Sequence, residues 1–475
     1  MAFTDRLHNR GSISTGYDID NSCKFEPDNS EYLGKTPTSS GNRRTFTISM
    51  WIKRTEFGMD CYLMEAGDGD YNQSDRTLIK FDSSDKFRFG GGSSYERITN
   101  RVFRDASAWY HIVMAVDTTD STAGNRLKLY INGVQETSFG TSADPSQNFQ
   151  YAFCKDDEHT VGFNHTDNVS YFAGYMSEVI LIDGQQLDPT SFGEFDADSG
   201  IWKPIDVSGL TFGTNGFYLD FKDSANLGND ASGGTDFTEN NITAADQAVD
   251  TPTNNFATWQ LNNYNPTVSA DFTFIEGATT PVRNSGDVHV YCVSTMAMSS
   301  GKWYMEYKVR SSSDSVYFGG TPITQFASEN HNGYYLGQDG GGSIGYGAGA
   351  FLYYWTGANT QYTENRATGD IIGVALDKDN DKIAFSKNGT FMLGTNGVRT
   401  DPSTPSTMHE VQAPPYFWAF GAFTGSIQYE TNMGGFTSNT PSSAESDENG
   451  YGAFEYAPPT GYYALCTKNL AEFGG

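Results

Sequence analysis

Acidic residues that could catalyse sugar hydrolysis lie close together at Glu194, Asp196 and Asp198. Glycoside hydrolysis needs two carboxyl groups about 5–10 Å apart across a sugar-binding cleft. Acids that alternate along one strand would share such a cleft, because successive side chains of a strand point to opposite faces. The segment lacks the second glutamate that this arrangement requires, and it lies between Gly193 and Gly200. We therefore expect no hydrolase site here, although acids from elsewhere in the chain could converge.

A serine nucleophile is suggested by residues 341–345, whose sequence GGSIG satisfies G-x-S-x-G. That motif exposes its serine only on a sharp turn between a strand and a helix, and no helical pattern follows Ser343. The same glycine-rich tract satisfies G-x-G-x-x-G through Gly340, Gly342 and Gly345, where chance matches are expected. The seven histidines are scattered and none forms H-E-x-x-H. The sequence therefore predicts loop glycines and a protein that is not an enzyme.

Calcium is the cofactor that the acidic residues favour most. Asp68, Asp70 and Asp75 supply the hard oxygen ligands that this ion prefers, and it takes six to eight of them. The alternative is a solvated acidic loop that binds no metal. Asp377, Asp379 and Asp381 also alternate, but the glycine and distant glutamate of a calcium loop are missing, which predicts a hairpin turn.

Aromatic residues flank the glycine tract and are the candidate ligand-binding residues. Rings in loops stack on the C–H faces of sugars, and they also serve in adaptable protein-binding loops. Alternation along a strand means that about half of such rings must point into the core instead. The residues concerned are Tyr334, Tyr335, Tyr353, Tyr354 and Trp355.

The net charge of the 475-residue chain is −28, from 58 acidic and 30 basic residues. Phosphate groups would be repelled by this charge, so we expect no nucleic-acid partner. The charge serves solubility in a salty medium, or it allows divalent cations to bridge the acids to a partner.

The five cysteines, Cys23, Cys61, Cys154, Cys292 and Cys466, form no C-x-x-C pair, which predicts buried free thiols and folding in a reducing cytoplasm. The first residues lack the apolar core of a signal peptide, and no run of about 18 apolar residues occurs. We expect a soluble protein without membrane insertion.

Abundant Gly, Tyr and Phe and short stretches of alternating apolar residues predict an all-β fold. Residues 45–53 and 110–116 alternate with period two, and residues 126–131 run into Asn132-Gly133, a strong hairpin signal. Such short strands favour antiparallel, jelly-roll-like β-sandwiches.

The length of the chain exceeds that of one core, and the composition changes along it. Strand patterns concentrate in two blocks, and the stretch between them is rich in Gly, Asn, Asp, Ser and Thr. We expect two sandwich domains joined by a long connector, with these parts: an N-terminal arm over 1–20, a first sandwich over 21–190, the connector over 191–260, a second sandwich over 261–435 and an irregular tail over 436–475.

The first block resembles laminin G-like domains of the concanavalin A type. The resemblance rests on FTISMWIKR (46–54), WYHIVMAVD (109–117), RLKLYINGV (126–134) and YMSEVILIDGQQLDPTSF (175–192). It implies a sandwich of the kind used in lectins, adhesion modules and assembly proteins. It also implies calcium near loops such as residues 68–75.

The second block resembles SPRY domains. The matching segments are SGKWYMEYKV (300–309), GDIIGVALDKDNDKIAFSKNG (369–389) and PPYFWAFGAF (414–423), in the order of that family. The resemblance implies a bent β-sandwich whose loops bind protein partners.

The joined pattern is similar to structural proteins of tailed bacteriophages, especially marine ones. FGEFDADSGIWKP (192–204), TPTNNFATW (251–259) and PPTGYYALCTKNL (458–470) contribute to this likeness. It implies a protein of the virion surface that is assembled in the host bacterial cytoplasm.

Together these features predict a non-enzymatic tail fibre or receptor-binding component that adheres to a host cell-surface glycan or protein. Other virion proteins and further copies of the chain are the expected partners, and several weak sites on one particle would raise avidity. The arm over 1–20 is a candidate anchor. The alternatives are a capsid-surface decoration protein and a polysaccharide depolymerase.

Overall fold

The computed structural model shows an almost entirely β chain that divides into two compact units. Among the described residues, the first unit covers residues 16–253 and the second begins at residue 254. The expected all-β fold with antiparallel sheets is confirmed. The structure describes residues 16–67, 75–91, 95–261, 272–284, 289–310, 316–326, 336–337, 341–347, 351–354, 359–361, 364–394, 397–423, 427–435 and 441–474.

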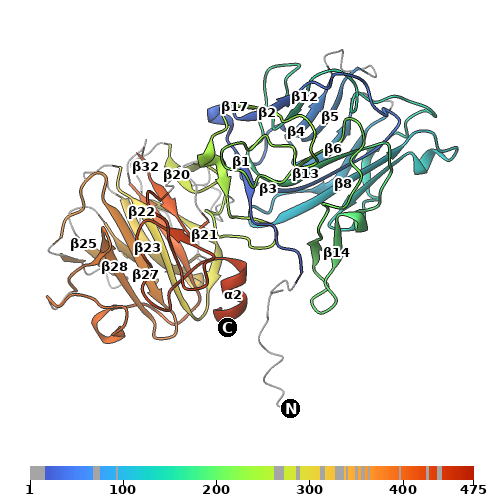
Figure 1. The fold of residues 1–475 in the computed structure, drawn as a ribbon. Helices are drawn as coiled ribbons and strands as arrows, with labels where there is room; N and C mark the ends of the chain where they lie inside the picture. Colours follow the sequence, from blue (N-terminus) through green and yellow to red (C-terminus); the bar gives the residue numbers. More distant parts are fainter. Residues whose placement is uncertain are drawn as a thin grey trace. The chain divides into compact units, whose positions relative to one another are not determined.

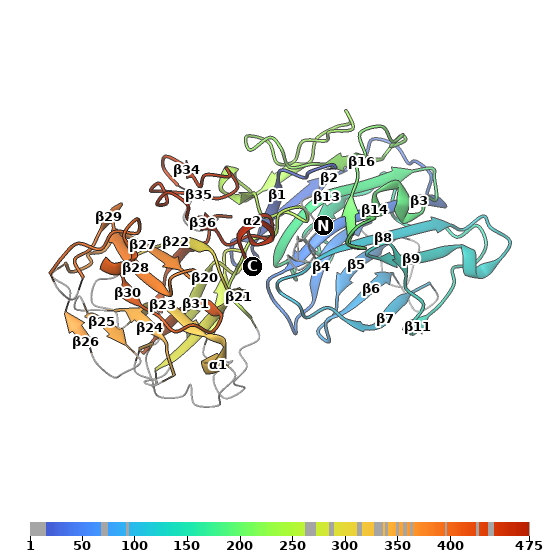
Figure 2. The same cartoon turned by 90° about the horizontal axis from the view of Figure 1, so that it is seen from below.

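The first unit contains two eight-stranded sheets (Figures 1 and 2). The first sheet has the order β10-β9-β8-β3-β13-β1-β18, with β16 also paired to β13. Its strands are β1 (Ser22–Phe25), β3 (Thr45–Arg54), β8 (Trp109–Asp117), β9 (Leu127–Ile131), β10 (Val134–Gln135), β13 (Gly174–Asp183), β16 (Phe217–Leu219) and β18 (Gln247–Ala248).

The second sheet of this unit has the order β11-β7-β6-β5-β4-β12-β2-β17. The apolar core of the unit draws residues from strands of both sheets. The strands of the second sheet are β2 (Tyr32–Lys35), β4 (Cys61–Ala66), β5 (Thr77–Phe81), β6 (Lys86–Gly90), β7 (Arg97–Val102), β11 (Phe139–Ser142), β12 (His159–Val161) and β17 (Thr238–Asn240).

The alternation in β3 places its side chains as expected. Phe46, Ile48, Met50 and Ile52 all lie in the core, because alternate side chains share one face of a strand. The turn at Asn132-Gly133 is left-handed at both residues, with φ of 48° and 77°, as a tight hairpin with a type I′ turn requires.

Residues 191–253 differ from the expected connector, because they form part of the first unit. Strands β16, β17 and β18 pair with β13, β2 and β1 and so extend both sheets. The hairpin of β14 (Gly193–Phe195) and β15 (Trp202–Pro204) projects from the unit (Figure 1). A second apolar cluster joins Phe192 and Val207 to Ile180 and Ile182 of β13. The segment therefore covers sandwich surface that would otherwise be exposed.

Three ion pairs fasten this segment to the early strands. The ammonium group of Lys24 lies 2.9 Å from the carboxylate of Asp246. That of Lys35 lies 3.0 Å from Asp230, and that of Lys53 lies 2.6 Å from Asp250. Lys53 is 0% exposed and Asp250 is 1% exposed. The indole N–H of Trp109 also donates a hydrogen bond to Asp250 at 2.9 Å.

The second unit is also built from sheets that are antiparallel except for the parallel pairing of β36 with β22, and its main sheets have six and seven strands. The first has the order β21-β31-β23-β24-β25-β26, and the second has β29-β28-β27-β22-β33 with β30 and β36 at its sides. The strands of the first are β21 (Val290–Met298), β23 (Val316–Pro322), β24 (Ile344–Tyr346), β25 (Phe351–Tyr354), β26 (Asn359–Gln361) and β31 (Tyr416–Ala422).

The seven-stranded sheet meets the first around a core that contains Trp303 and Trp418. Its strands, with those at its sides, are β22 (Lys302–Lys308), β27 (Ile371–Asp377), β28 (Lys382–Lys387), β29 (Thr390–Phe391), β30 (His409–Glu410), β33 (Glu430–Asn432) and β36 (Tyr463–Ala464). The remaining strands and α-helices of the unit are β19 (Phe272–Ile275), β20 (Thr280–Arg283), β32 (Ile427–Gln428), β34 (Glu445–Ser446), β35 (Ala453–Phe454), α1 (Ile323–Phe326) and α2 (Thr467–Phe473).

Both ends of the second unit differ from the expected boundaries. Trp259, placed in the connector from sequence, is fully buried in the second core. Residues 441–474, placed in an irregular tail, contribute β36, which pairs with β22. Glu306 of β22 accepts backbone N–H groups of Glu455 and Tyr456 at 2.8 and 3.0 Å, so the last segment is hydrogen-bonded to the sheet.

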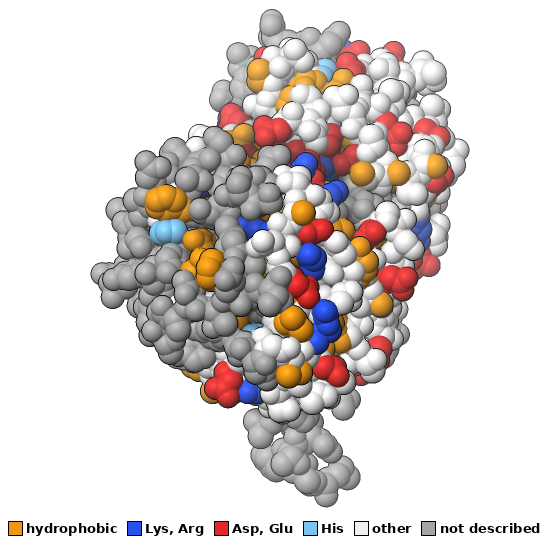
Figure 3. Space-filling view, turned by 90° about the vertical axis from the view of Figure 1, so that its left-hand side faces the viewer, with side chains coloured by type: hydrophobic (Ala, Val, Ile, Leu, Met, Phe, Trp, Pro, Cys, Tyr) orange, Lys and Arg blue, Asp and Glu red, His pale blue; other side chains and the backbone are white. Residues whose placement is uncertain are grey.

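The hairpin expected at residues 377–381 is confirmed, because β27 and β28 pair antiparallel across it. Asp377 accepts from the backbone and side-chain nitrogens of Asn380, and Asp379 accepts from Gly301 N–H at 2.7 Å. On the face of the molecule in Figure 3, Lys and Arg side chains of the described part lie among Asp and Glu side chains.

All five cysteines are free and buried, as expected. Burial raises the pKa of the Cys23, Cys154 and Cys292 thiols, which keeps them protonated and unreactive. Within the described residues, no helix has the length and hydropathy that crossing a membrane requires.

Replacing Asp250 by alanine should destabilise the first unit by about 3–5 kcal/mol, because Lys53 would keep an uncompensated charge in the core. Calorimetric unfolding of the full chain would measure this loss. The exposed Asp198→Ala on the β14–β15 hairpin is the control and should change stability by less than about 0.5 kcal/mol. Equal effects of the two substitutions would contradict the role of the ion pair.

Candidate functional site

A β-bulge in the middle of β13 brings a carboxyl group to the outer face of the first sheet. Ser177 pairs with Trp51 and Ile180 pairs with Ser49, so Glu178 and Val179 together oppose a single residue of β3. Glu178 adopts a left-handed backbone with φ of 50°. Met176 and Val179 both face the core, so the extra residue is absorbed between them. Bulges of this kind redirect side chains, often next to functional sites.

Two tyrosines meet the redirected carboxylate. Tyr218, on the neighbouring strand β16, donates its hydroxyl to Glu178 at 2.7–2.8 Å. The Tyr17 hydroxyl lies 3.4 Å from the same carboxylate and 3.3 Å from the Tyr218 hydroxyl. Ile19, two residues further on, is held by hydrogen bonds in both directions with Thr253 Oγ1. The segment that carries Tyr17 is thereby fixed to the end of the first unit.

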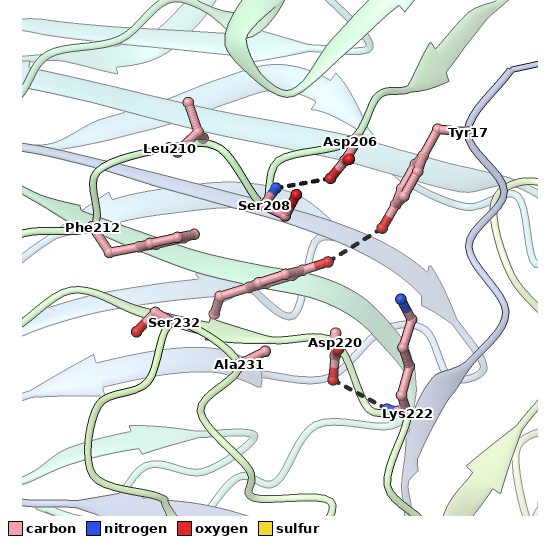
Figure 4. A pocket seen from close by; sticks show the side chains of 10 residues that line it. Tyr17, Asp206, Ser208, Leu210, Phe212, Asp220, Lys222, Ala231 and Ser232 are labelled. Atoms are coloured by element: carbon pink, nitrogen blue, oxygen red, sulfur yellow. Dashed lines mark hydrogen bonds between the residues drawn. The ribbon is translucent and has the colours of Figure 1, made fainter.

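Both tyrosines line an open pocket of about 440 Å³ (Figure 4). The ring of Phe212 lies parallel to that of Tyr218, with centroids 5.9 Å apart, at the opposite end from Tyr17 (Figure 4). The lining consists of Tyr17, Asp206, Ser208, Leu210, Phe212, Tyr218, Asp220, Lys222, Ala231 and Ser232.

Burial raises the pKa of Glu178 to about 7, although the Tyr218 hydroxyl bond opposes this shift. Burial and the nearby Glu178 charge raise the pKa of Tyr17 to about 12. Hydrogen bonds from Ser208 lower the pKa of the exposed Asp206 carboxyl. At neutral pH, therefore, the rim carries an ionised Asp206 while both tyrosines keep their protons.

The pocket combines aromatic faces with hydrogen-bonding groups at its rim. Asp206 and Asp220 supply acceptors, and Lys222 and Ser232 supply donors. Pockets that orient small polar ligands have this character, with an apolar surface and a few placed polar groups. The arrangement can bind and orient a hydroxyl-bearing ligand.

Residues 28–186, which contain the bulged strand, match the model of the concanavalin A-like lectin/glucanases superfamily, in its laminin G form. Residues 28–186 of the first unit are thus laminin G-like in sequence. The resemblance of the first block is confirmed, and the laminin G-like unit is completed by residues up to 253 that lie beyond the match. No curated protein matches the chain in sequence.

Several solved structures are similar to parts of the chain. A candidate carbohydrate-binding protein of Bacteroides ovatus is 16% identical over 48% of this chain and 60% of its own, with a TM-score of 0.34. The SPRY domain of human HERC1 is 14% identical over 34% of this chain and 94% of its own, with a TM-score of 0.26. Domains LG4-5 of the mouse laminin alpha1 chain are 11% identical over 86% of this chain and 84% of their own, with a TM-score of 0.28.

A serine–histidine pair in the laminin G-like unit has the wrong protonation for catalysis. His111 Nδ1 accepts from the Trp202 indole at 2.9 Å, so the other ring nitrogen carries the proton and donates to Ser49 Oγ at 2.8 Å. Burial lowers the pKa of His111 to about 3. A histidine that donates to a serine cannot remove its proton, so this pair is structural.

The acids and the serine singled out as possible catalysts also have structural roles. Asp196 lies in the β14–β15 hairpin, where it accepts from Ser199 and pairs with Lys203 at 3.2 Å. Ser343 is fully buried, accepts from Gly337 N–H at 2.7 Å and leads into a strand, β24.

The predicted aromatic site lies mostly outside the described residues, which do not include Tyr334, Tyr335 or Trp355. Tyr354 ends β25. Tyr353 is half-buried and packs against Tyr317, with ring centroids 5.1 Å apart. Tyr353 therefore belongs in part to a small apolar cluster, and the ligand-binding role of these residues stays a prediction.

The predicted calcium site is also mostly outside the described residues, which omit Asp68 and Asp70. Asp75 lies 3.8 Å from the Lys155 ammonium group. Nearby, the guanidinium of Arg76 pairs with both Glu65 and Asp167, which gives those acids an organic cation as their partner. Within the described residues, no group of three or more metal-binding side chains is close enough to hold an ion.

The pocket residues were missed from sequence because they fall in segments assigned to the arm and the connector. Tyr17 lies in the expected arm, and Tyr218 lies in a short apolar stretch, residues 217–221, within the expected connector. The alternation of that stretch was the available signal: Phe217 and Leu219 face the core while Tyr218 faces outward.

Glu178→Gln should flatten the pH dependence of stability. The unfolded carboxyl loses its proton near pH 4.5 and the folded one near pH 7. The folded state therefore binds more protons in this window, and stability falls as pH rises through it. Because glutamine does not titrate, the loss of stability between pH 5 and pH 8 should shrink by about 2–3 kcal/mol.

Denaturant unfolding of the laminin G-like unit at the two pH values measures this difference. The exposed Glu194→Gln serves as the matched control and should behave as the unmodified chain does. A Glu178→Gln variant that keeps the full decline would show that this carboxyl does not titrate with the raised pKa.

Proposed function

We propose that this chain is a non-enzymatic adhesion protein that binds a cell-surface glycan through the Tyr17–Tyr218 pocket. The observation that carries the proposal is an open pocket on a laminin G-like unit, in which tyrosine rings lie beside carboxylate and ammonium groups. Sugars present apolar C–H faces and rings of hydroxyl groups, and this lining complements both surfaces.

The pocket is held in shape before any ligand arrives. The hydrogen bonds of Glu178 fix the hydroxyl of Tyr218 and support that of Tyr17. The ion pair of Asp230 with Lys35 anchors the loop that carries Ala231 and Ser232, and Asp230 also accepts from Tyr218 N–H at 3.0 Å. Preorganisation of this kind reduces the ordering cost of binding.

The proposal of binding without catalysis is supported by the geometry of Glu178. Its carboxyl is 3% exposed and is occupied by the two tyrosine hydroxyls, so it does not reach the lining of the pocket. A glycosidase needs both of its carboxyl groups at the sugar. The remaining acids of the lining, Asp206 and Asp220, lie at its rim with Lys222.

We propose further that the protein resides on the virion surface of a tailed bacteriophage, as a tail fibre or receptor-binding component. The sequence likeness to such structural proteins supports this proposal, and so does the SPRY-like pattern of the second unit, which we propose as a second binding module. Several copies on one particle would convert a weak pocket into firm attachment. Other virion proteins and a host glycan or protein are the partners.

Tyr17→Ala should reduce glycan binding about tenfold, because an aromatic ring that stacks on a ligand contributes about 1.5 kcal/mol. Tyr17→Phe should retain most of the affinity, since it keeps the ring. Binding of the full chain to an array of bacterial surface glycans would measure both effects. Phe195→Ala, which removes a ring that is 52% exposed outside the pocket, is the control.

The same glycans should be recovered intact after incubation. A reducing-end assay that detects sustained sugar release would overturn the non-enzymatic proposal and favour a depolymerase.

Unchanged binding by Tyr17→Ala would show that this pocket is not the glycan site. Gold-labelled antibodies against the chain should decorate the tails of intact particles; labelling confined to the capsid would favour a decoration protein.

A further inference from the structure

The lining of the pocket contains more carboxylate groups than ammonium groups, and this imbalance restricts the kind of ligand that the pocket can bind. Two carboxylates, those of Asp206 and Asp220, stand in the lining with one ammonium group, that of Lys222. Glu178 is bonded to Tyr17 and Tyr218 but is not part of the lining. The charges of Asp206, Asp220 and Lys222 face the same small volume of about 440 Å³.

Each rim carboxylate keeps acceptor capacity for a ligand. Asp206 accepts hydrogen bonds from Ser208, whose N–H lies 2.9 Å from Oδ1, and Asp220 Oδ1 accepts Lys222 N–H at 3.2 Å. These turns orient the carboxylates, and a carboxylate has lone pairs beyond those that one or two such bonds use. Carboxylate oxygens are acceptors only, so the ligand must provide donors to them.

Lys222 is the only cationic side chain of the lining. It is exposed, and its positive charge also helps to lower the pKa of the Asp206 carboxyl. One ammonium group can donate to a ring or hydroxyl oxygen of a ligand. It cannot compensate both rim carboxylates and also the carboxylate of an acidic ligand.

We infer that the pocket takes an uncharged, hydroxyl-rich sugar residue and discriminates against uronic, sialic and other acidic sugars. This inference rests on the proposed glycan-binding function and names its ligand class. Hydroxyl groups donate to Asp206 and Asp220 and accept from Lys222, so a neutral sugar satisfies all three groups. An acidic sugar sets a carboxylate against Asp206 and Asp220, in a chain whose net charge is −28.

The test uses a matched series of neoglycoproteins that display neutral hexosides, the corresponding hexuronides and the corresponding 2-amino sugars, in the gluco, galacto and manno configurations. Binding of the full chain is measured at low and at high salt. One neutral configuration should bind at least tenfold more tightly than its hexuronide, with affinity almost independent of salt, because no net charge is neutralised.

Asp206→Asn is the informative variant, since the asparagine oxygen can still accept Ser208 N–H while the charged acceptor is lost. The affinity for neutral sugars should fall about tenfold or more, because hydrogen bonds to charged groups contribute strongly. The ratio of the affinity for a neutral hexoside to that for its hexuronide should also become smaller. Asp223→Asn is the matched control: Asp223 accepts Ala225 N–H at 2.9 Å in the same kind of turn but does not line the pocket.

Preferential, salt-sensitive binding of hexuronides that Tyr17→Ala removes would overturn the inference and leave the glycan-binding function standing. Preferential, salt-sensitive binding of amino sugars would overturn it too, because the rim would then be a cation site. Absence of binding to every sugar, and to the glycan array, would overturn both proposals together. If Asp206→Asn and Asp223→Asn bound neutral sugars equally well, the Asp206 carboxylate would not be a ligand-binding group, and the inference would be overturned.

Discussion

Buried lysine–aspartate pairs are the constraint on which the laminin G-like unit depends. Lys24 and Lys53 lie on strands that begin the unit, while Asp246 and Asp250 lie near its end. A buried charge without its partner is costly, so the two ends of the unit must come together. This closure goes with the pairing of β16 and β13, which places Tyr218 in the lining of the pocket.

The buried carboxyl group of Glu178 beside the pocket is a second unfavourable feature, which the fold must offset. A carboxyl group in the middle of a central strand would face the core if the strand were regular, but the bulge in β13 sends Glu178 outward. There it receives the hydroxyls of Tyr218 and Tyr17, which satisfy part of its hydrogen-bonding capacity. A strained backbone and a raised carboxyl pKa at one position are the features that structures tend to concentrate at functional sites.

Much of the fold followed from local pattern. The alternation of β3 predicted its buried face, Asn132-Gly133 predicted a hairpin, and residues 377–381 predicted a turn. The candidate site did not follow in the same way. Its residues come from segments separated by about 200 positions along the chain, and polar composition alone gave residues 191–253 the character of a connector.

The sequence by itself determined the strand class, the laminin G-like block, the free cysteines and the acidic surface, because each depends on composition or on neighbours a few residues apart. Tertiary structure alone decided where the first unit ends and that Tyr17, Tyr218 and Glu178 meet. The physical reason is that the carboxylate that pairs with Lys53 of β3 lies 197 residues further along the chain. Only the folded sheet brings Asp250 within 2.6 Å of Lys53, and the pocket forms with that contact.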